Sequence, residues 1–377
     1  MKHIYDYTFY ELGKFYGKRI YEKGEKNNLT LETKFNQKWE KLSDIGYFKM
    51  IVPQKYGGLE LNYKDMVEFT IGLGYGAEGE NNLFSANVQV WACIAPIIKF
   101  ASENLIKCYI PRLMSPHYIC AHAISEENAG SSVFDMEMTY EKNEYGYILN
   151  VTKKYVTNAP VANCFIIYAK EKCDLYKKNP QITCFLVEKD SSIVIGKRID
   201  KMGLTLSPMS NIYLKNCLVD DGNILGRLNQ GRNIFNYTMA LERTFLLAYQ
   251  IGIMEKQLEK VTDFVKKRTQ GGKKIIEYQS VSNRLADMKV NLEASKLFIK
   301  SMTKKLSNGE DIYLDSSIAK LFVSDALVEN CYNAMKNYGT VGYTDDLDIS
   351  RNLCDALGSQ FYSGTSDIKR NIISSLL

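Results

Sequence analysis

The segment 234–254 reads Ile-Phe-Asn-Tyr-Thr-Met-Ala-Leu-Glu-Arg-Thr-Phe-Leu-Leu-Ala-Tyr-Gln-Ile-Gly-Ile-Met, and Glu242 and Arg243 are its only charged residues. A helix that is apolar on nearly every side is buried inside a protein. Glu242 lies on one stripe with Met239 and Leu246, at helical spacings of three and four. A carboxylate placed there either pairs with a cation, such as an arginine of another helix, or has a chemical use. Because burial strengthens a carboxylate as a proton acceptor, Glu242 is a candidate general base.

The sequence around this segment has the periodicity of a helical bundle. All seven prolines lie at or before Pro208, so the C-terminal part of the chain contains no helix breaker of that kind. Apolar residues recur at spacings of three and four over residues 234–268, 278–308 and 313–338, and a short stretch runs from residue 366 to the end. Four such helices predict a four-helix bundle over residues 229–377.

The middle of the chain has a different pattern, which predicts a β domain. Five short segments rich in β-branched and aromatic residues cover 118–123, 148–156, 164–169, 182–188 and 211–219. Turn residues such as Asn143-Glu-Tyr-Gly146 separate them, which is typical of a small β-barrel or sandwich. We expect this domain at 118–228, behind an N-terminal helical domain at 1–117 with helices near 34–45, 63–73, 83–97 and 102–114. The predicted fold class is therefore α+β, mostly α.

Composition excludes several classes of protein. The chain has 377 residues, 45% hydrophobic and 24% charged, with 48 Lys plus Arg against 43 Asp plus Glu. This balance is that of a globular protein, and the small positive excess does not predict nucleic-acid binding. The amino terminus does not resemble a signal peptide, and no apolar run approaches the length of a membrane helix. Nine scattered cysteines without a C-x-x-C pair favour reduced thiols and a cytoplasmic location.

Several motifs together resemble the acyl-CoA dehydrogenase family of flavoproteins. The stretch Cys120-Ala-His-Ala-Ile-Ser-Glu-Glu-Asn-Ala-Gly-Ser-Ser132 resembles its flavin- and substrate-binding signature, and Lys154-Tyr-Val-Thr-Asn158 resembles its W-I-T-N motif. Asn337-Tyr-Gly-Thr-Val-Gly-Tyr343 and Gly364-Thr-Ser-Asp-Ile-Lys-Arg370 resemble two later motifs, and further matches keep the family's order. The resemblance implies three domains: N-terminal helical, middle β-barrel and C-terminal four-helix bundle. It also implies an FAD cofactor and a homodimer or homotetramer.

One departure from the common family pattern concerns the catalytic base. Many members carry Y-E-G-T near the C-terminus, whereas this chain has Tyr362-Ser-Gly-Thr365. Isovaleryl- and long-chain-type members instead place the glutamate in L-E-R, which this chain has as Leu241-Glu-Arg243. The resemblance therefore implies that Glu242 takes the α-proton of an acyl thioester while a hydride passes to flavin N5. The backbone N–H of Ser363 is then expected to bind the thioester carbonyl.

The resemblance also implies a set of binding residues. Ser125, Tyr155 and Thr157 match residues at the flavin ring. Arg268, Gln279 and Gly339 match residues of the regions that reach the cofactor of a neighbouring subunit. Thr365 and Asp367 match positions near the adenosine, whereas Ser131 and Arg243 are assigned to the substrate. Without the resemblance, Ser125 and Thr157 would be ordinary turn or strand hydroxyls.

The function predicted from these residues is the α,β-dehydrogenation of an acyl thioester, an oxidation of a CH–CH group. The overall pattern resembles family members that act on acyl carrier proteins in polyketide and nonribosomal peptide pathways, although CoA remains an alternative carrier. An electron-accepting flavoprotein or oxygen would reoxidise the cofactor. Two other functions stay open: a flavin monooxygenase or N-hydroxylase on the same fold, and a non-catalytic homologue. His117 and His122 have no partner at ligand spacing, so no metal site is expected.

Overall fold

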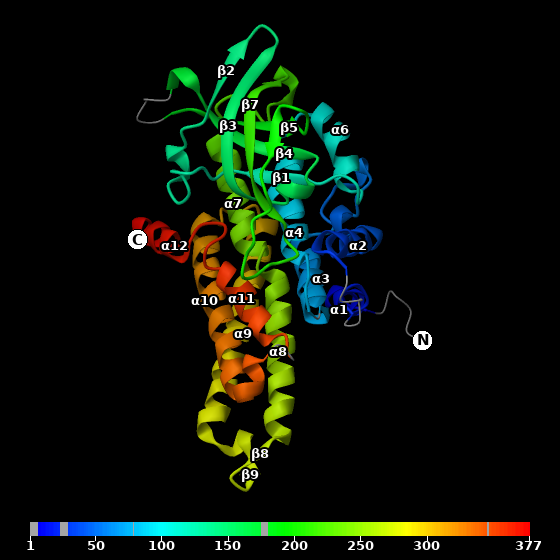
Figure 1. Cartoon of the computed structure of the whole chain (residues 1–377), viewed down its shortest axis with the longest axis vertical. Helices are drawn as coiled ribbons and strands as arrows, with labels where there is room; N and C mark the ends of the chain where they lie inside the picture. Colours follow the sequence, from blue (N-terminus) through cyan, green and yellow to red (C-terminus); the bar gives the residue numbers. More distant parts are fainter. Residues whose placement is uncertain (1–6, 23–28, 78, 175–179, 345–346) are drawn as a thin grey trace.

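The computed structural model describes residues 7–22, 29–77, 79–174, 180–344 and 347–377. The chain forms a β domain at one end, a long helical bundle at the other, and an N-terminal group of helices packed at the side of both (Figure 1). The predicted α+β fold with this domain order is confirmed.

Four of the N-terminal helices begin at positions capped by a side chain. Side chains of Thr8, Thr30, Asn62 and Ser102 accept hydrogen bonds from backbone N–H groups of the first helical turn. Such caps satisfy donors that have no partner within the helix. The helices are α1 (Phe9–Ile20), α2 (Leu31–Asp44), α3 (Tyr63–Gly76), α4 (Leu83–Asn87), a π-helix (Val88–Ile94), α5 (Ala95–Phe100) and α6 (Glu103–Leu113).

Contrary to the expectation from the sequence, one stretch, Leu83–Phe100, is apolar enough and long enough to cross a membrane, yet 83% of it is buried within the protein. It is the one such stretch among the described residues. Its packing partners are α7 (Gly231–Phe245) and β1 (Cys120–Ala123). Its hydrophobicity is therefore explained by its position in the core.

The β domain is a curled, mixed sheet with its own apolar core. The strands are β1, β2 (Thr139–Asn143), β3 (Gly146–Thr157), β4 (Cys164–Glu171), β5 (Ile182–Glu188), β6 (Ile193–Ile195) and β7 (Met209–Val219). Their order is β1-β4-β2-β3-β7-β6, with β5 on the other edge of β4. The five predicted strands are present, and β2 and β6 were not predicted. Because β1 and β4 pair in parallel, the end of the N-terminal domain is fixed to the middle of the sheet.

The C-terminal domain corrects two expectations about its helices. The helix predicted over 234–268 is two helices, α7 and α8 (Ala248–Lys267), separated by a turn at Leu246 and Leu247. The remaining helices are α9 (Gln279–Ser307), α10 (Tyr313–Tyr338), α11 (Ile349–Gly358) and α12 (Ser366–Ser375). Helix α11 was not predicted. A small hairpin, β8 (Thr269–Gln270) and β9 (Lys273–Lys274), closes the end of the bundle farthest from the sheet (Figure 1).

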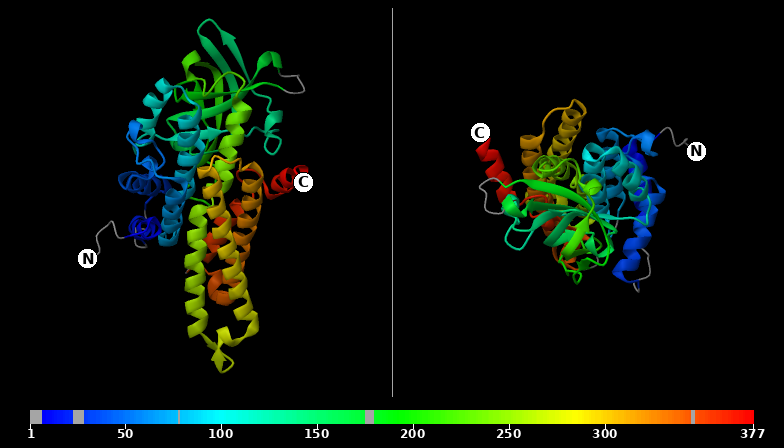
Figure 2. Two further views of the ribbon diagram at one scale, coloured as in Figure 1. Left: turned by 180° about the vertical axis from the view of Figure 1, so that it is seen from behind. Right: turned by 90° about the horizontal axis from the view of Figure 1, so that it is seen from above.

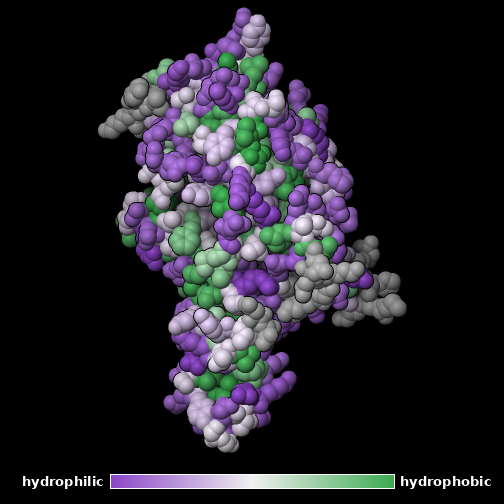
Figure 3. All heavy atoms as spheres, in the orientation of Figure 1, coloured by the Kyte–Doolittle hydropathy of each residue, from purple (hydrophilic) through white to green (hydrophobic). Residues whose placement is uncertain are grey.

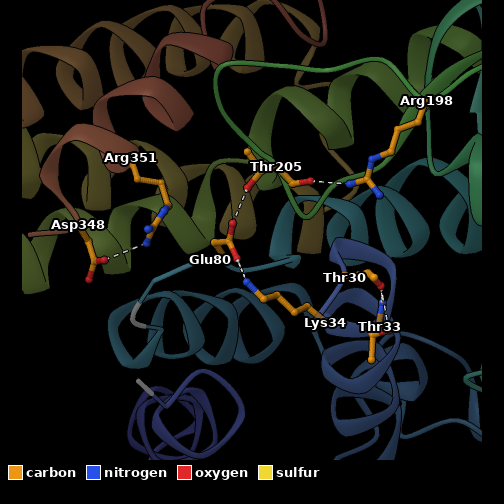
Figure 4. Close-up of polar contacts among 8 residues, drawn as sticks. All are labelled: Thr30, Thr33, Lys34, Glu80, Arg198, Thr205, Asp348 and Arg351. Carbon is orange, nitrogen blue, oxygen red and sulfur yellow. Dashed lines mark hydrogen bonds and ion pairs between the residues drawn. The ribbon is translucent and has the colours of Figure 1, made fainter. Parts of the chain in front are cut away.

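Glu80 joins the three parts of the molecule (Figure 4). Its carboxylate accepts a hydrogen bond from Lys34 Nζ on α2 at 2.8 Å and from Thr205 Oγ1 at 3.4 Å. Thr205 lies in the loop between β6 and β7, and Arg198 donates to its carbonyl oxygen at 2.7 Å. Burial opposes ionisation of Glu80, but Lys34 and the charge of Arg351 outweigh it and lower the pKa of the carboxyl group. The N–H of Leu204, in the same loop, donates to Asp355 Oδ1 in the bundle at 2.5 Å, so the loop is held between the N-terminal helices and the bundle.

Candidate functional site

Glu242 lies on α7, where this helix meets the sheet. The residue is 7% exposed, as expected from its apolar stripe. Its Oε1 lies 3.1 Å from Nδ1 of His122, and its Oε2 accepts a hydrogen bond from Ser363 Oγ at 2.6 Å. Among the described residues, its partners are thus a histidine and a serine rather than an arginine of another helix. Both carboxylate oxygens are oriented by groups that came from separate parts of the chain.

The sheet explains how His122 reaches this helix. His122 is on β1, opposite Ile166 of the parallel strand β4. Tyr168, two residues further along β4, points to the same face because side chains alternate along a strand. Its hydroxyl lies 3.2 Å from His122 Nε2. The side chain of His122 is 4% exposed and Tyr168 is 1% exposed, so this contact is buried.

Ser363 lies in the loop between α11 and α12. Its backbone has a φ of +53°, a left-handed conformation that is uncommon for residues other than glycine. Lys320 on α10 stabilises this loop, because its Nζ donates to the carbonyl oxygen of Gly364 at 2.9 Å. The neighbouring Tyr362 packs against Phe84 with ring centroids 4.6 Å apart. The loop is therefore held in a set position beside Glu242.

Three buried basic side chains lie near Glu242 or next to one another. Arg243, Lys320 and Lys369 are exposed by 4%, 1% and 0%. Burial, together with the neighbouring positive charges, lowers the pKa of Lys320 to about 7 and that of Lys369 to about 6. Arg243 Nη1 contacts Ser317 Oγ at 3.4 Å, and the guanidinium lies over the ring of Tyr313. Arg243, predicted to bind substrate, thus contacts two residues of α10 in the bundle.

The signature loop after β1 is anchored by a buried ion pair. Lys153 Nζ donates to Glu126 Oε1 at 2.7 Å, and the two side chains are 0% and 3% exposed. Backbone N–H groups of Glu137 and Met138 donate to the other carboxylate oxygen at 2.6 and 3.2 Å. One carboxylate therefore ties β3 to both ends of the loop, on which the predicted substrate residue Ser131 is exposed.

Ser125, Tyr155 and Thr157 come from neighbouring segments. The N–H of Lys154 donates to the carbonyl oxygen of Ser125 at 2.8 Å, which places the loop next to the end of β3. Tyr155 has a φ of +55°, and its side chain leaves the sheet and is 63% exposed. Asn211 fixes this conformation, because its Oδ1 accepts from the N–H of Tyr155 at 3.1 Å. An exposed aromatic ring with a fixed backbone conformation fits a planar ring system such as a flavin.

The other predicted cofactor residues lie far from this place in the same chain. Arg268, Gln279 and Gly339 flank the hairpin at the far end of the bundle, and Arg268 and Gln279 are exposed (Figure 1). Helix α8 alone has 20 residues, which corresponds to about 30 Å. Figure 2 shows the same separation from behind. Within a single chain, the length of the bundle therefore separates these residues from Ser125, Tyr155 and Thr157.

Two further predicted residues begin α12. Thr365 is the N-cap, and its hydroxyl accepts from the N–H of Ile368 at 3.2 Å. Asp367 is exposed and pairs with Arg370 at 3.3 Å. These contacts give both residues a local structural role, in addition to the predicted role near adenosine.

His122 and Tyr168 are the site residues that sequence reasoning missed. They lie 120 and 74 residues before Glu242, so no spacing in the sequence relates them to it. Their contact becomes visible only in the paired strands of the structure. Within the described part of the chain, no three His, Cys, Asp or Glu side chains are grouped as a metal site would require.

Comparison with known proteins follows the same division into domains. The sequence matches the N-terminal domain of acyl-CoA dehydrogenases over residues 13–116, the middle domain over 121–217 and the C-terminal domain over 229–377. It is 33% identical over 350 residues to an L-prolyl-[peptidyl-carrier protein] dehydrogenase of Serratia sp. (strain ATCC 39006), covering 91% of this chain and 90% of that one. It is 30% identical over 345 residues to a mitochondrial isovaleryl-CoA dehydrogenase of Oryza sativa subsp. japonica, covering 89% and 81%.

Solved structures agree with these sequence matches. The prolyl acyl carrier protein oxidase AnaB superposes with a TM-score of 0.92 and 32% identity, covering 100% of this chain and 99% of that chain. PigA, solved with FAD and proline, superposes with a TM-score of 0.90 and 29% identity, covering 98% and 96%.

Proposed function

Because the chain belongs to the acyl-CoA dehydrogenase family, we propose that it is an FAD-dependent oxidoreductase that removes hydrogen from the Cα–Cβ bond of an acyl thioester. The observation that supports this most directly is the buried carboxylate of Glu242, held between β1 and the loop of Ser363. A base for an α-proton must be buried, positioned and close to an oxyanion donor. The position before Gly364-Thr365, where many family members carry the catalytic glutamate, is occupied by Ser363 in this chain.

Each residue of the site has a separate role in the proposed reaction. Glu242 accepts the α-proton on its carboxylate, and the backbone N–H of Ser363 donates to the thioester oxygen, which acidifies the α-carbon. Ser125, Tyr155 and Thr157 orient the cofactor ring, and Ser131 lies where the pantetheine arm would pass. FAD, when bound, supplies the acceptor for the β-hydride. The side chain of Ser363 is not required for the backbone donor, and its hydroxyl orients Glu242 instead.

Aromatic rings around the base favour a compact acyl group. Phe245, one turn beyond Glu242, packs against Trp91 with centroids 4.4 Å apart, and Phe84 packs against Tyr362. Phe245 and Trp91 are at most 1% exposed and Phe84 is 6% exposed. Filling the space beside the base with rings excludes a long acyl chain from these directions. A short or cyclic acyl group fits, and the prolyl group in the names of two relatives is of this size.

We propose a carrier protein as the carrier of the acyl group. The support is that a sequence relative and a structural neighbour that are each over 30% identical carry carrier-protein substrates in their names. CoA has the same pantetheine arm and remains the second candidate because an isovaleryl-CoA dehydrogenase is also similar. An electron-transferring flavoprotein or oxygen would complete the cycle. No disulfide joins any of the nine cysteines, all of which lie among the described residues, and this fits a cytoplasmic enzyme.

The proposed cofactor site is built from two subunits. Arg268 and Gln279 lie too far from Tyr155 to serve the same FAD molecule within one chain, so a partner chain must supply one half. Exposed apolar side chains on the bundle provide surface for this contact: Val290, Leu297 and Phe361 are 65–67% exposed. In Figure 3, hydrophobic residues are interspersed along the bundle on the face shown. We therefore propose a homodimer or a tetramer made from two dimers.

An anaerobic reduction experiment tests the proposed function. The purified holoenzyme is mixed without oxygen with prolyl, butyryl and octanoyl groups, each attached to a carrier protein and to CoA. We expect the flavin absorbance to bleach with compact acyl groups on the carrier protein, more slowly with CoA, and not with octanoyl. Reduction only by an external reductase would indicate a monooxygenase, and a preparation without FAD would indicate a non-catalytic homologue.

A further inference from the structure

Glu242 has two carboxylate oxygens, and they are not equivalent. Oε1 faces Nδ1 of His122 at 3.1 Å, and Oε2 faces the hydroxyl of Ser363 at 2.6 Å. Ser363 belongs to the loop whose backbone would bind the thioester oxygen. Oε2 is therefore the oxygen nearer to the reacting carbon, and Oε1 lies on the side of the sheet.

The hydrogen-bond partner on the far side of His122 decides which ring nitrogen carries the proton. A tyrosine hydroxyl donates readily, and Tyr168 lies 3.2 Å from Nε2. When Tyr168 donates to Nε2, the neutral ring carries its proton on Nδ1 and donates it to Glu242. The opposite tautomer would direct the lone pair of Nδ1 at a carboxylate, which is repulsive. In this buried chain, hydrogen bonds are therefore donated in one direction, from Tyr168 to His122 and from His122 to Glu242.

We propose that His122 is a positioning residue for Glu242, with Tyr168 fixing its tautomer. The N–H at Nδ1 holds Oε1 so that Oε2 is the atom that accepts the α-proton. The same contact makes the base sensitive to acid, because a protonated imidazole would form an ion pair with Glu242 and weaken it as a proton acceptor. This inference rests on the proposed function, in which Glu242 is the base.

Other ionisable groups lie near Glu242 and would also contribute to the pH dependence of the rate. They are Arg243 on α7, Tyr168 on β4, Cys93 in the π-helix, Lys369 on α12, and Lys320 on α10 beside Arg243. Lys320 and Lys369 change charge near neutral pH, so a wild-type pH profile alone would not identify His122. A substitution at His122 leaves these groups in place, and the difference between two profiles isolates its contribution.

The test compares His122→Asn with His122→Leu. An asparagine amide keeps a donor near the position of Nδ1 but does not ionise, and leucine removes the donor at similar volume. At pH 8 and saturating thioester, we expect flavin reduction to slow about 10- to 100-fold in His122→Leu and at most about 5-fold in His122→Asn, with KM little changed in both. The acid limb of the rate should move to lower pH in His122→Asn than in wild type.

A second readout does not depend on turnover. The chain has three histidines, so nitrogen NMR of ¹⁵N-histidine holoenzyme resolves each ring. We expect His122 at pH 8 to carry its proton on Nδ1, and Tyr168→Phe to abolish that preference and slow reduction. A proton on Nε2 in wild type, or an acid limb unchanged in His122→Asn, would overturn the inference. If His122→Leu does not fold, the pH profile of His122→Asn and the tautomer of His122 measured by NMR still test the inference.

The variant Glu242→Gln separates this inference from the proposed function. If Glu242→Gln reduces the flavin at the wild-type rate, the proposed base is wrong. If Glu242→Gln is slow while His122→Asn and His122→Leu match wild type in rate and pH profile, only the role of His122 is wrong.

Discussion

Lys369 is a residue whose burial should cost folding free energy. It is 0% exposed, and its Nζ has no hydrogen-bond partner among the described residues. Arg243 and Lys320 lie close to it, so its charged form is disfavoured both by desolvation and by repulsion. The negative charge of Glu242 acts in the opposite direction and offsets these two effects only in part.

The substitution Lys369→Met should therefore stabilise the protein. The pKa of Lys369 falls to about 6 in the folded protein, whereas an unfolded lysine has a pKa near 10.5. The unfolded chain binds more protons between these values, so wild-type stability rises with pH across that window. The variant Lys369→Met should exceed wild type in free energy of unfolding by the largest amount near pH 6, and this difference should vanish at about pH 10.

Urea unfolding of the holoenzyme at several pH values measures this gain. Lys300→Met, at an exposed position on α9, serves as the control and should leave the pH dependence unchanged. A Lys369→Met protein that is less stable than wild type at pH 6 would show that the cation is needed by the fold.

Sequence reasoning identified Glu242 because its evidence is local. A single carboxylate on an apolar helix contradicts the hydrophobic pattern, and such a contradiction marks a site. His122 gave no comparable signal, since one histidine at a partly polar strand position has many ordinary explanations. Its role depends on the register of β1 against β4, which a pattern of short strands does not determine.

At the scale of elements, the loop after β1 depends on one buried ion pair. Glu126 accepts from Lys153 and from two backbone N–H groups, and neither charged side chain is more than 3% exposed. Removing one partner of a buried pair leaves an uncompensated charge, which costs about 3 to 5 kcal/mol. The loop also shapes the predicted thioester site, so stability and substrate binding should change together.

The substitution Lys153→Met tests this dependence. We expect a loss of about 3 kcal/mol in the free energy of unfolding and weaker binding of the thioester. Lys154→Met is the matched control, because Lys154 pairs with Glu127, whose side chain is 70% exposed, and a surface pair contributes little. Equal stability of the two variants in denaturant unfolding would contradict the role assigned to Glu126.

The limits of element prediction have physical causes. The turn at Leu246 and Leu247 was missed because neither proline nor glycine marks it, and the tertiary contacts of α7 and α8 differ. Strand β6 has three residues, too few for a clear alternation. The long helices α9 and α10 were predicted within one residue of their bounds, since long periodic segments carry most information.

At the scale of the whole molecule, the separation of Tyr155 from Arg268 makes a specific prediction about assembly. If each FAD is bound by the β domain of one chain and the bundle end of another, Tyr155→Ala and Arg268→Ala damage different halves of the site. A mixed dimer of the two variants then contains one intact site. Each variant alone should retain little FAD.

Refolding an equal mixture of the two variants with FAD measures this complementation. Random pairing should restore FAD binding and activity to about a quarter of all sites. No recovery above the separate variants would mean that one chain supplies both halves. Light scattering of wild type should show at least a dimer.

The central claim is that Glu242 takes the α-proton, and the direct measurement is anaerobic flavin reduction in Glu242→Gln. With the best thioester from the substrate screen, we expect the rate to fall 10²- to 10⁴-fold at unchanged FAD content, the usual contribution of a general base. Ser363→Ala should slow reduction far less than Glu242→Gln, because it removes a hydroxyl that orients Glu242 but keeps the backbone N–H. The claim would be contradicted if Glu242→Gln reduced the flavin at the wild-type rate, or if Ser363→Ala were the only variant that abolished reduction.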